Sequence, residues 1–386
     1  MEEWKEYKLG DVLTIKYGKD HKQLADGDIP IYGSGGIMRY GERSLYDGPS
    51  ILIPRKGSLN NVIYADKPFW TVDTMFWSII NDSIANPLFV YYSICKKDFA
   101  SLNVGSAVPS LTVPVIEDID ILLPPKATQD KVVSILKSLD DKIELNRHIN
   151  DNLEQQAQAL FKSWFVDFEP FLREEFFKSD SLFGDIPVEW HIVAIKDLSV
   201  YITDYVANGS FASLRENVRL YDKPNYAHFI RNTDLKAESY KMYVDKHSYE
   251  FLSKSVLEGG EIIISNVGDV GSVFLCPKLE KPMTLGNNII LLRPKKDYLT
   301  FYLYMLFKGG IGQHLIDGVT GGSAQRKFNK TDFKSIKLMM PPVNILIKFD
   351  RIVKPIFSKI EENRDEISRL TSLRDTLLPK LMSGEL

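Results

Sequence analysis

The sequence carries one series of short motifs twice, in the same order. Glycines and an aliphatic run in residues 48–62 recur 211 positions later, in residues 259–273. Three further blocks recur at an offset of 217 positions: Gly-Ser-Ala at 105–107 and 322–324, Pro-Pro at 124–125 and 341–342, and Lys-Ile-Glu at 142–144 and 359–361. Chance similarity does not place separate blocks in one order. The 386-residue chain is therefore expected to fold as two copies of one unit.

Each copy follows the same plan, in which a strand-rich region precedes one long helix. Short aliphatic runs such as 51–53 and 262–264 are bounded by Gly, Pro, Asn and Asp, which is the signal for strands joined by turns. One short helix is predicted in each strand-rich region, over about 87–97 and 298–308, the first with Asn86 as its N-cap. The Pro-Pro pair marks the boundary to the long helix, because a residue before proline is biased away from helical geometry. The pattern predicts an α+β fold.

The long helices, predicted over 126–165 and 343–380, carry a heptad seam. Seam residues recur at alternating intervals of four and three, which is typical of a coiled coil. They are Val132, Leu136, Leu139, Ile143, Asn146, Asn150, Leu153, Ala157, Leu160 and Trp164, then Phe349, Val353, Ile356, Ile360, Asn363, Ile367, Leu370, Arg374 and Leu377. A seam of this length favours an antiparallel coiled coil, which suits two domains related by a pseudo-two-fold axis. The alternative is that each helix packs only on its own domain.

Asn146 and Asn363 occupy the same seam position in the two copies. A buried asparagine costs stability but requires a polar partner, so it fixes the register of a helix pair. These features divide the chain into a first strand-rich domain (1–125), a helical spacer (126–178), a second strand-rich domain (179–342) and a second spacer (343–386). Residues 165–177 are rich in aromatic side chains, and we expect them to pack where the first helix meets the second domain.

Composition and motifs exclude several function classes. The net charge is −3, and the two strand-rich domains carry 12 basic against 16 acidic and 20 basic against 18 acidic residues, which argues against a nucleic-acid binder acting alone. No P-loop, His-Glu-x-x-His zinc site or Gly-x-Ser-x-Gly elbow occurs, so no catalytic or metal site is expected. Two distant cysteines, no long apolar run and no signal peptide predict a cytoplasmic chain that does not enter the membrane.

Several glycine-rich or basic loops are candidates for contacts with nucleic acid. Arg and Lys bridge guanine edges, Asn and Gln bridge adenine, and glycine lets the backbone approach a phosphate closely. The candidates are Tyr32, Ser34, Arg39, Arg55 and Lys56 in the first domain, and Arg231, Asn232, Asn266, Gln325, Arg326 and Lys327 in the second. Taken singly, each of these loops also fits an ordinary turn.

Further stretches occur together in order along the whole chain. They include Ile-Pro-Ile-Tyr-Gly-Ser-Gly-Gly at 29–36, Ile-Pro-Arg-Lys-Gly-Ser at 53–58, Leu-Asp-Asp-Lys-Ile-Glu-Leu-Asn at 139–146, Gly-Asp-Ile-Pro-Val-Glu-Trp at 184–190 and Gly-Gly-Ser-Ala-Gln-Arg-Lys-Phe-Asn at 321–329. With these stretches and its two-copy order of domain and helix, the chain resembles the specificity (S) subunit of a type I restriction–modification system over essentially its full length.

The resemblance implies two target recognition domains, each reading one half of a split site in double-stranded DNA. It implies that the helices set the gap between the halves and dock methyltransferase (M) subunits. It also implies no catalytic residue or cofactor in this chain, with S-adenosylmethionine, ATP and Mg²⁺ expected on the M and restriction (R) subunits. The alternatives are the S-type subunit of a methylation-only or phage-exclusion system, a two-domain scaffold that binds only proteins, and a chain that is itself an enzyme.

Overall fold

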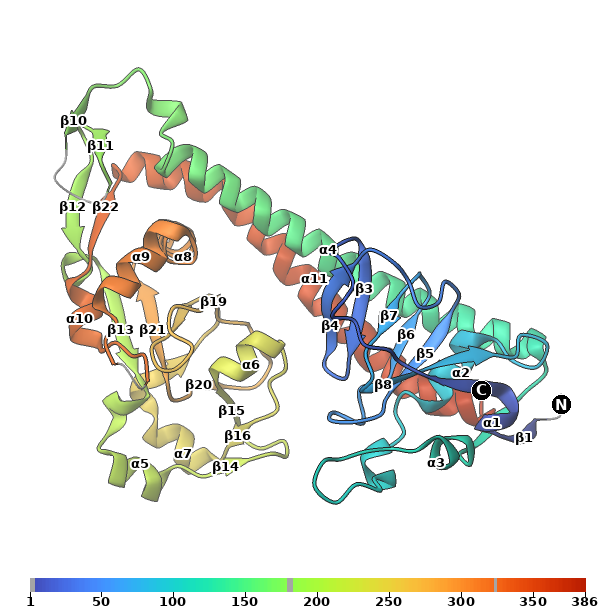
Figure 1. Cartoon of the computed structure of the whole chain (residues 1–386). Helices are drawn as coiled ribbons and strands as arrows, with labels where there is room; N and C mark the ends of the chain where they lie inside the picture. Colours follow the sequence, from blue (N-terminus) through green and yellow to red (C-terminus); the bar gives the residue numbers. More distant parts are fainter. Residues whose placement is uncertain (1–3, 179–182, 323–324) are drawn as a thin grey trace. The chain divides into compact units, whose positions relative to one another are not determined.

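A computed structural model describes residues 4–178, 183–322 and 325–386 (Figure 1). The chain divides into two compact units, of which unit 1 comprises residues 1–147 and 365–386 and unit 2 comprises residues 148–364. Each unit therefore contains one strand-rich region and part of each long helix. No helix in the described ranges is both long and apolar enough to cross a membrane.

Unit 1 contains a four-stranded sheet, a three-stranded sheet and a separate strand pair. The four-stranded sheet has the order β2 (Leu13–Tyr17), β8 (Met75–Ile80), β5 (Ser50–Pro54) and β6 (Ile63–Ala65). The three-stranded sheet has the order β4 (Gly36–Gly41), β3 (Ile29–Gly33) and β7 (Trp70–Thr71), and the pair is β1 (Lys5–Lys8) with β9 (Asp120–Leu123). Its helices are α1 (Leu9–Val12), α2 (Pro87–Ile94) and α3 (Val113–Glu117).

Unit 2 contains a four-stranded sheet, a five-stranded sheet and two strand pairs. The sheets have the orders β13 (Val200–Asp204), β21 (Ile289–Pro294), β18 (Ile262–Ser265), β19 (Val273–Leu275), and β14 (Leu220–Tyr221), β16 (Tyr243–Val244), β15 (Ala227–Ile230), β20 (Met283–Leu285), β17 (Val256–Leu257). The pairs are β10 (Phe176–Lys178) with β11 (Asp185–Pro187), and β12 (His191–Ala194) with β22 (Lys337–Met340). Its helices are α5 (Phe211–Asn217), α6 (Asn232–Ala237), α7 (Lys246–Phe251), α8 (Thr300–Lys308), α9 (Gly310–Val319) and α10 (Lys330–Ser335).

The two units share one topology, which confirms the internal repeat. The order β2-β8-β5-β6 in unit 1 matches β13-β21-β18-β19 in unit 2, and all of these pairings are antiparallel. The parallel pairing of β3 with β7 in unit 1 is also matched, by that of β15 with β20 in unit 2. Strands β14 and β16 and helices α5 and α7 lie between β13 and β18, in a segment that is longer than the one between β2 and β5 in unit 1.

The central strands β5 and β18 are buried along their whole length. Alternate residues of β5 belong to different apolar clusters, because Ile51 and Ile53 pack in one and Leu52 in another. In β18, Ile262 and Ile264 likewise separate from Ile263. A strand covered on both faces requires an unbroken apolar run, which is why both copies show one in the sequence.

The predicted short helices are confirmed as α2 and α8. The side chain of Asn86 accepts hydrogen bonds from the backbone N–H groups of Leu88 and Phe89, at 2.9 and 3.4 Å, and Pro87 is the first helical residue. This cap is tied to the long helix by the buried Gln129. Its Oε1 accepts from the Asn86 backbone N–H at 2.8 Å, and its amide donates to the carbonyl oxygen of Pro124 at 2.9 Å.

The long helices are α4 (Lys126–Phe165) and α11 (Val343–Ser383), which agree with the predicted spans to within three residues. Every predicted seam position is buried or half-buried. In unit 1, Asp140 of α4 accepts from the guanidinium of Arg374 of α11 at 2.8 Å, and Asn146 donates to Glu366 at 2.8 Å. Since residue numbers rise on one helix as they fall on the other, the pair is antiparallel. The alternative that each helix packs only on its own domain is wrong.

The seam positions that are not apolar are all hydrogen-bonded. In unit 2, Asn363 donates its side-chain amide to the side-chain oxygen of Asn150 at 2.8 Å. Asn363 and its counterpart in unit 1, Asn146, are both almost fully buried. In unit 1, Asp140 also accepts from the hydroxyl of Tyr92 at 2.6 Å. The hydrogen bonds to carboxylates raise the pKa of Arg374 against the opposing effect of burial. Paired polar groups of this kind favour one register of the two helices.

Residues 165–171 pack as predicted, within unit 2, whereas residues 172–177 are exposed. Phe165, Phe168 and Phe171 are buried and surround Trp190, with ring centroids 5.9, 5.3 and 5.3 Å from its ring. Phe165 also meets Phe349 of α11 edge-on at 4.7 Å. The segment therefore ends α4 inside the core of unit 2.

The Asn150–Asn363 bond provides a test of the seam. Replacing Asn363 alone with Leu is expected to destabilise unit 2 by about 1 kcal/mol, because the Asn150 side-chain oxygen loses its donor. Replacing both residues with Leu is expected to be neutral or stabilising, because both partners of the bond are removed together. Urea-induced unfolding measures both effects, with Asn152→Leu on the exposed face of α4 as the control. An equal loss in the single and double variants would contradict the register-setting role.

Candidate nucleic-acid interface

In unit 1, the loops that hold predicted contacts meet at one end of the four-stranded sheet. The loop after β5 joins the turn before β8, where the backbone N–H of Arg55 donates to the carbonyl oxygen of Thr74 at 2.8 Å. Two residues later, the N–H of Gly57 donates to the carbonyl oxygen of Pro109 at 3.1 Å. This bond adds the loop 103–110 to the same edge.

The turn between β3 and β4 lies on this edge as well. The side-chain amide of Asn61 donates to the carbonyl oxygen of Ser34 at 2.9 Å. Gly57 has a φ of +89°, and a Cβ placed there would lie 2.9 Å from the Ser34 hydroxyl oxygen. Glycine is therefore required at 57 both by backbone geometry and by the close approach of the turn. We call residues 33–36, 55–61, 72–74 and 103–110 the loop edge of unit 1.

Unit 2 repeats these contacts. The N–H of Gly268 donates to the carbonyl oxygen of Arg326 at 2.9 Å, and the N–H of Asn266 donates to that of Asn288 at 3.0 Å. Gly268 has a φ of +78° and corresponds to Gly57. The loop edge of unit 2 comprises residues 231–232, 266–271, 286–288 and the described part of 320–329. Both loop edges thus use one arrangement of backbone hydrogen bonds.

The predicted residues of unit 1 differ in how freely they reach solvent. Tyr32 is half-buried, with its ring 6.4 Å from that of Phe69, and burial raises the pKa of its hydroxyl. The half-buried guanidinium of Arg55 donates to the carbonyl oxygen of Asp73 at 3.2 Å and lies 5.5 Å above the ring of Tyr17. Lys56 is exposed. Ser34, Arg55 and Lys56 therefore share one edge.

Arg39 is the predicted contact of unit 1 that lies apart from the loop edge. It sits on β4, and its guanidinium donates to the carbonyl oxygens of His21 and Leu24 at 2.8 and 2.7 Å. It also forms an ion pair with Asp26 at 3.0 Å. These bonds hold the segment 21–26 against β4, so a DNA contact from Arg39 requires some of them to break.

In unit 2, Arg231 and Asn232 stand at the start of α6. The guanidinium of Arg231 donates twice to the buried carboxylate of Asp234, at 2.9 and 2.7 Å, and this raises the pKa of Arg231. The side-chain amide of Asn232 donates to Asp269 at 3.1 Å. Both residues are therefore held in place by acidic neighbours.

Asp269 is a residue of the loop edge that sequence reasoning missed. Its carboxylate is bonded by Lys236 at 2.6 Å, Ser272 at 2.6 Å and Asn232 at 3.1 Å. The hydrogen bond from Lys236, followed by that from Ser272, lowers the pKa of Asp269 to about 2. The aspartate therefore stays charged and fixes the position of Asn232. A lone acid in a loop offers no sequence signal for this role, because Lys236 and Asn232 come from another element, α6.

The remaining predicted residues of unit 2 lie on the loops around Gly268. Asn266 donates its side-chain amide to the carbonyl oxygen of Phe328 at 3.3 Å. Arg326 forms an exposed ion pair with Asp317, whereas Gln325 and Lys327 are exposed. Among the residues that the model describes, no carboxylate lies within ion-pair distance of Lys56 or Lys327.

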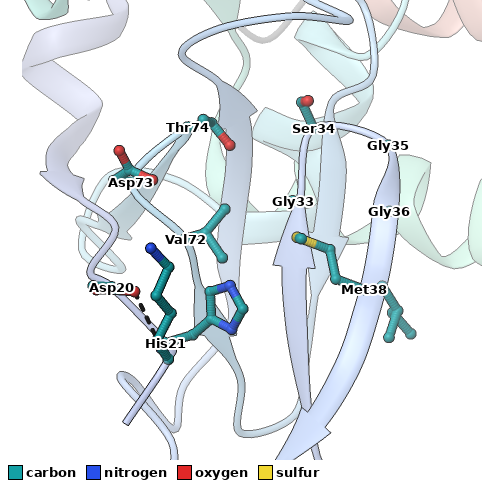
Figure 2. Close-up of a pocket in the computed structure, with 12 residues that line it drawn as sticks. Asp20, His21, Gly33, Ser34, Gly35, Gly36, Met38, Val72, Asp73 and Thr74 are labelled. Carbon is teal, nitrogen blue, oxygen red and sulfur yellow. Dashed lines mark hydrogen bonds between the residues drawn. The ribbon is translucent and has the colours of Figure 1, made fainter. Parts of the chain in front are cut away.

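A shallow depression of about 710 Å³ opens at the loop edge of unit 1, beside the turn that joins β3 and β4 (Figure 2). Its lining combines the turn glycines with apolar and charged side chains. The lining residues are Asp20, His21, Lys22, Gly33, Ser34, Gly35, Gly36, Ile37, Met38, Val72, Asp73 and Thr74. In the described parts of both units, no group of three or more His, Cys, Asp or Glu side chains is arranged to hold a metal ion.

A family model for the type I restriction modification DNA specificity domain matches residues 1–155 and 187–371. The chain belongs to this family. The two matched segments correspond to the two copies of the repeat, so the family assignment and the shared topology agree.

Curated relatives support the same family. The chain is 24% identical to the type I restriction enzyme HindI specificity subunit of Haemophilus influenzae, with complete coverage of both chains. It is 26% identical to the MjaIX specificity subunit of Methanocaldococcus jannaschii, over 99% of this chain and 88% of that protein. The crystal structure of the S subunit of a type I system from M. genitalium matches with a TM-score of 0.57 at 18% identity, over 98% of this chain and 96% of that one. This last likeness supports the fold.

Proposed function

We propose that this chain is the DNA specificity subunit of a type I restriction–modification system and reads a bipartite site in double-stranded DNA. The observation that carries the proposal is the loop edge that occurs twice, once in each unit, on one arrangement of backbone hydrogen bonds. Two such edges in one chain fit two half-sites better than one continuous site. Joining two weak readers in one molecule raises the affinity for DNA that carries both half-sites.

The chain supplies recognition in this proposal, and its partner subunits supply the chemistry. S-adenosylmethionine is expected on the M subunits, and ATP and Mg²⁺ on the R subunits. A cytoplasmic location follows, because the DNA and the partners are found there. The candidate contacts remain Ser34, Arg55 and Lys56 in unit 1 and Asn232, Asn266, Gln325, Arg326 and Lys327 in unit 2, with Tyr32, Arg39 and Arg231 as supports for their loops.

The long helices offer a matched surface for two copies of one partner. Lys131, Ile135 and Lys142 form one exposed stripe on α4, at intervals of four and seven residues. Lys348, Ile352 and Lys359 repeat this stripe on α11, and both isoleucines are 46% exposed. Packing within the chain explains repeated seam residues but not repeated exposed ones. We propose these stripes as contacts for two identical M subunits that present an acidic, partly apolar surface.

Methylation in the complex tests the function. The chain is purified with the M subunit encoded beside it and incubated with a random-sequence DNA library and S-adenosylmethionine. We expect methylated adenines in two short motifs separated by a gap of fixed length. Methylation without sequence preference, or at one unsplit motif, would refute bipartite recognition. A motif that is methylated but never cleaved when the R subunit is added would indicate a methylation-only system.

Salt dependence tests the exposed lysines. Lys327→Ala is expected to weaken DNA binding by the complex and to reduce the slope of log affinity against log salt by about 0.9, because one phosphate contact is lost. Arg326→Ala is expected to change the slope less, because its charge is already paired with Asp317. Lys178→Ala, at an exposed lysine of β10, serves as the control. An unchanged slope in the Lys327 variant would remove that residue from the interface.

Substitution of the stripe isoleucines tests partner docking. Ile135→Asp and Ile352→Asp together are expected to abolish assembly with the M subunit, and each single variant should leave one of two copies bound. Mass measurement of the complex by light scattering distinguishes zero, one and two bound copies. Leu145→Asp, at another exposed position of α4, is the control for general effects on the helix. Two bound copies in the double variant would contradict the proposal.

A further inference from the structure

The loop edge of unit 1 and the adjoining start of β4 expose large apolar side chains. Ile37 and Met38 follow the glycine turn and are 50% and 59% exposed, and Val104 and Val108 on the loop 103–110 are 55% and 54% exposed. We call these four side chains the apolar rim. Leaving them in water costs free energy that burial against a partner would recover.

The equivalent positions of unit 2 carry polar groups or no side chain. The repeat aligns Val104 with Gly321 and Val108 with Gln325. The backbone contact that holds this loop, from Gly57 to Pro109 in unit 1 and from Gly268 to Arg326 in unit 2, is the same in both units. Ile37 and Met38 lie on β4, which follows β3, whereas the helix α6 follows β15 in unit 2. The two loop edges therefore differ in the side chains of the shared loop and in the element beside it.

The surroundings of the apolar rim indicate what covers it. Arg55 and Lys56 on the neighbouring loop provide positive charge at the same edge. The rim adjoins the hairpin of β3 and β4, whose turn Ser34-Gly35-Gly36 extends beyond the pairing with β7 and has open space around its glycines. The tip of a two-stranded hairpin fits the major groove of B-DNA, where thymine presents its methyl group.

Carboxylates beside the apolar rim indicate which part of the DNA, phosphate or base, lies in the depression. Asp20, Lys22 and Asp73 line the depression together with Ile37 and Met38. Figure 2 shows Asp20, Asp73 and Met38 around it. The two carboxylates outnumber the lysine, and their excess negative charge would repel a phosphate placed in the depression, whereas a base edge carries no net charge. The depression therefore suits bases, and Arg55 and Lys56 suit the phosphates beside them.

We propose that unit 1 reads its half-site through apolar contact between this rim and the methyl groups of thymine, and that unit 2 reads its half-site through polar groups. The inference rests on the proposed function and specifies which chemical feature of the DNA each unit recognises. Its direct consequence is that the two half-sites respond differently to the loss of thymine methyl groups.

Replacement of thymine by deoxyuridine tests this proposal, because it removes only the 5-methyl group. Duplexes carrying the methylation motif are made with deoxyuridine in one half-site at a time, and binding by the complex of this chain with its M subunits is measured. We expect about a fourfold loss of affinity for each contacted methyl in one half-site, which is equivalent to ~0.8 kcal/mol. The loss in the other half-site is expected to be less than twofold.

A variant assigns the effect to the apolar rim. Ile37→Ser, Val104→Ser and Val108→Ser combined should lower affinity for thymine-containing DNA and remove most of the deoxyuridine penalty, because serine carries no methyl group to contact thymine. Val188→Ser, at a 50% exposed valine of unit 2, should leave the penalty intact. Two results would show that the apolar rim does not contact thymine. One is a deoxyuridine penalty that persists in the triple variant, and the other is a triple variant that no longer binds the M subunit but keeps its affinity for DNA.

Different results would overturn the thymine proposal and the proposed function. A complex that methylates a split motif but tolerates deoxyuridine in both halves, or whose motif lacks thymine in either half, overturns the thymine proposal and leaves the proposed function standing. A complex that shows no split motif overturns both.

Discussion

The core of each unit depends on side chains from both long helices. In unit 1, Val132 and Leu136 of α4 are buried in one cluster with Leu378 and Leu381 from the end of α11. In unit 2, Phe161 and Phe165 of α4 share a cluster with Phe349 and Val353 of α11. A copy of the repeat cut out with its own helix would lack the partner segment and would leave apolar surface in water. The two copies of the repeat therefore depend on each other, because the long helix of each copy contributes side chains to the core of the other. The polar pairs in the seam matter for this reason, because a slip of register would displace core residues in both units.

The sequence was sufficient to predict the features that follow from local spacing. The long helices and their seam depend on the period of apolar residues, and the Asn86 cap depends on a side chain that reaches two or three positions along the chain. The structure confirms all of these predictions. The partners of polar groups could not be predicted in the same way. Asn363 bonds Asn150, and Asp269 accepts bonds from Lys236 and Asn232, through contacts that arise only after distant segments have packed. Arg39 shows the same limit, since no local pattern indicated the bonds by which it holds the segment 21–26.

The slightly acidic composition acquires a physical meaning at the loop edges. Arg231 is bonded by Asp234, Arg326 by Asp317, and Asn232 by Asp269. Such acids lower the positive charge that DNA would meet, but they also reduce the number of conformations that a long side chain must give up on binding. A recognition surface built in this way has modest affinity for phosphate and a well-defined shape. That combination suits a subunit whose partners contribute to holding the DNA, because weak sequence-independent binding leaves discrimination to the base contacts.

The repeat also separates the framework of recognition from its specificity. Backbone groups form the framework, since Gly57 bonds Pro109 as Gly268 bonds Arg326, and β-bridges join Lys56 to Ser110 and Val267 to Lys327. Backbone bonds place no demand on side chains apart from the glycine, so the positions around them are free to differ. They do differ, with Arg55 in place of Asn266, Pro109 in place of Arg326 and Ser110 in place of Lys327. Side chains with different donors and acceptors select different base edges. Two half-sites read by these loops are therefore expected to be unlike in sequence, even though the frames that present the loops are alike.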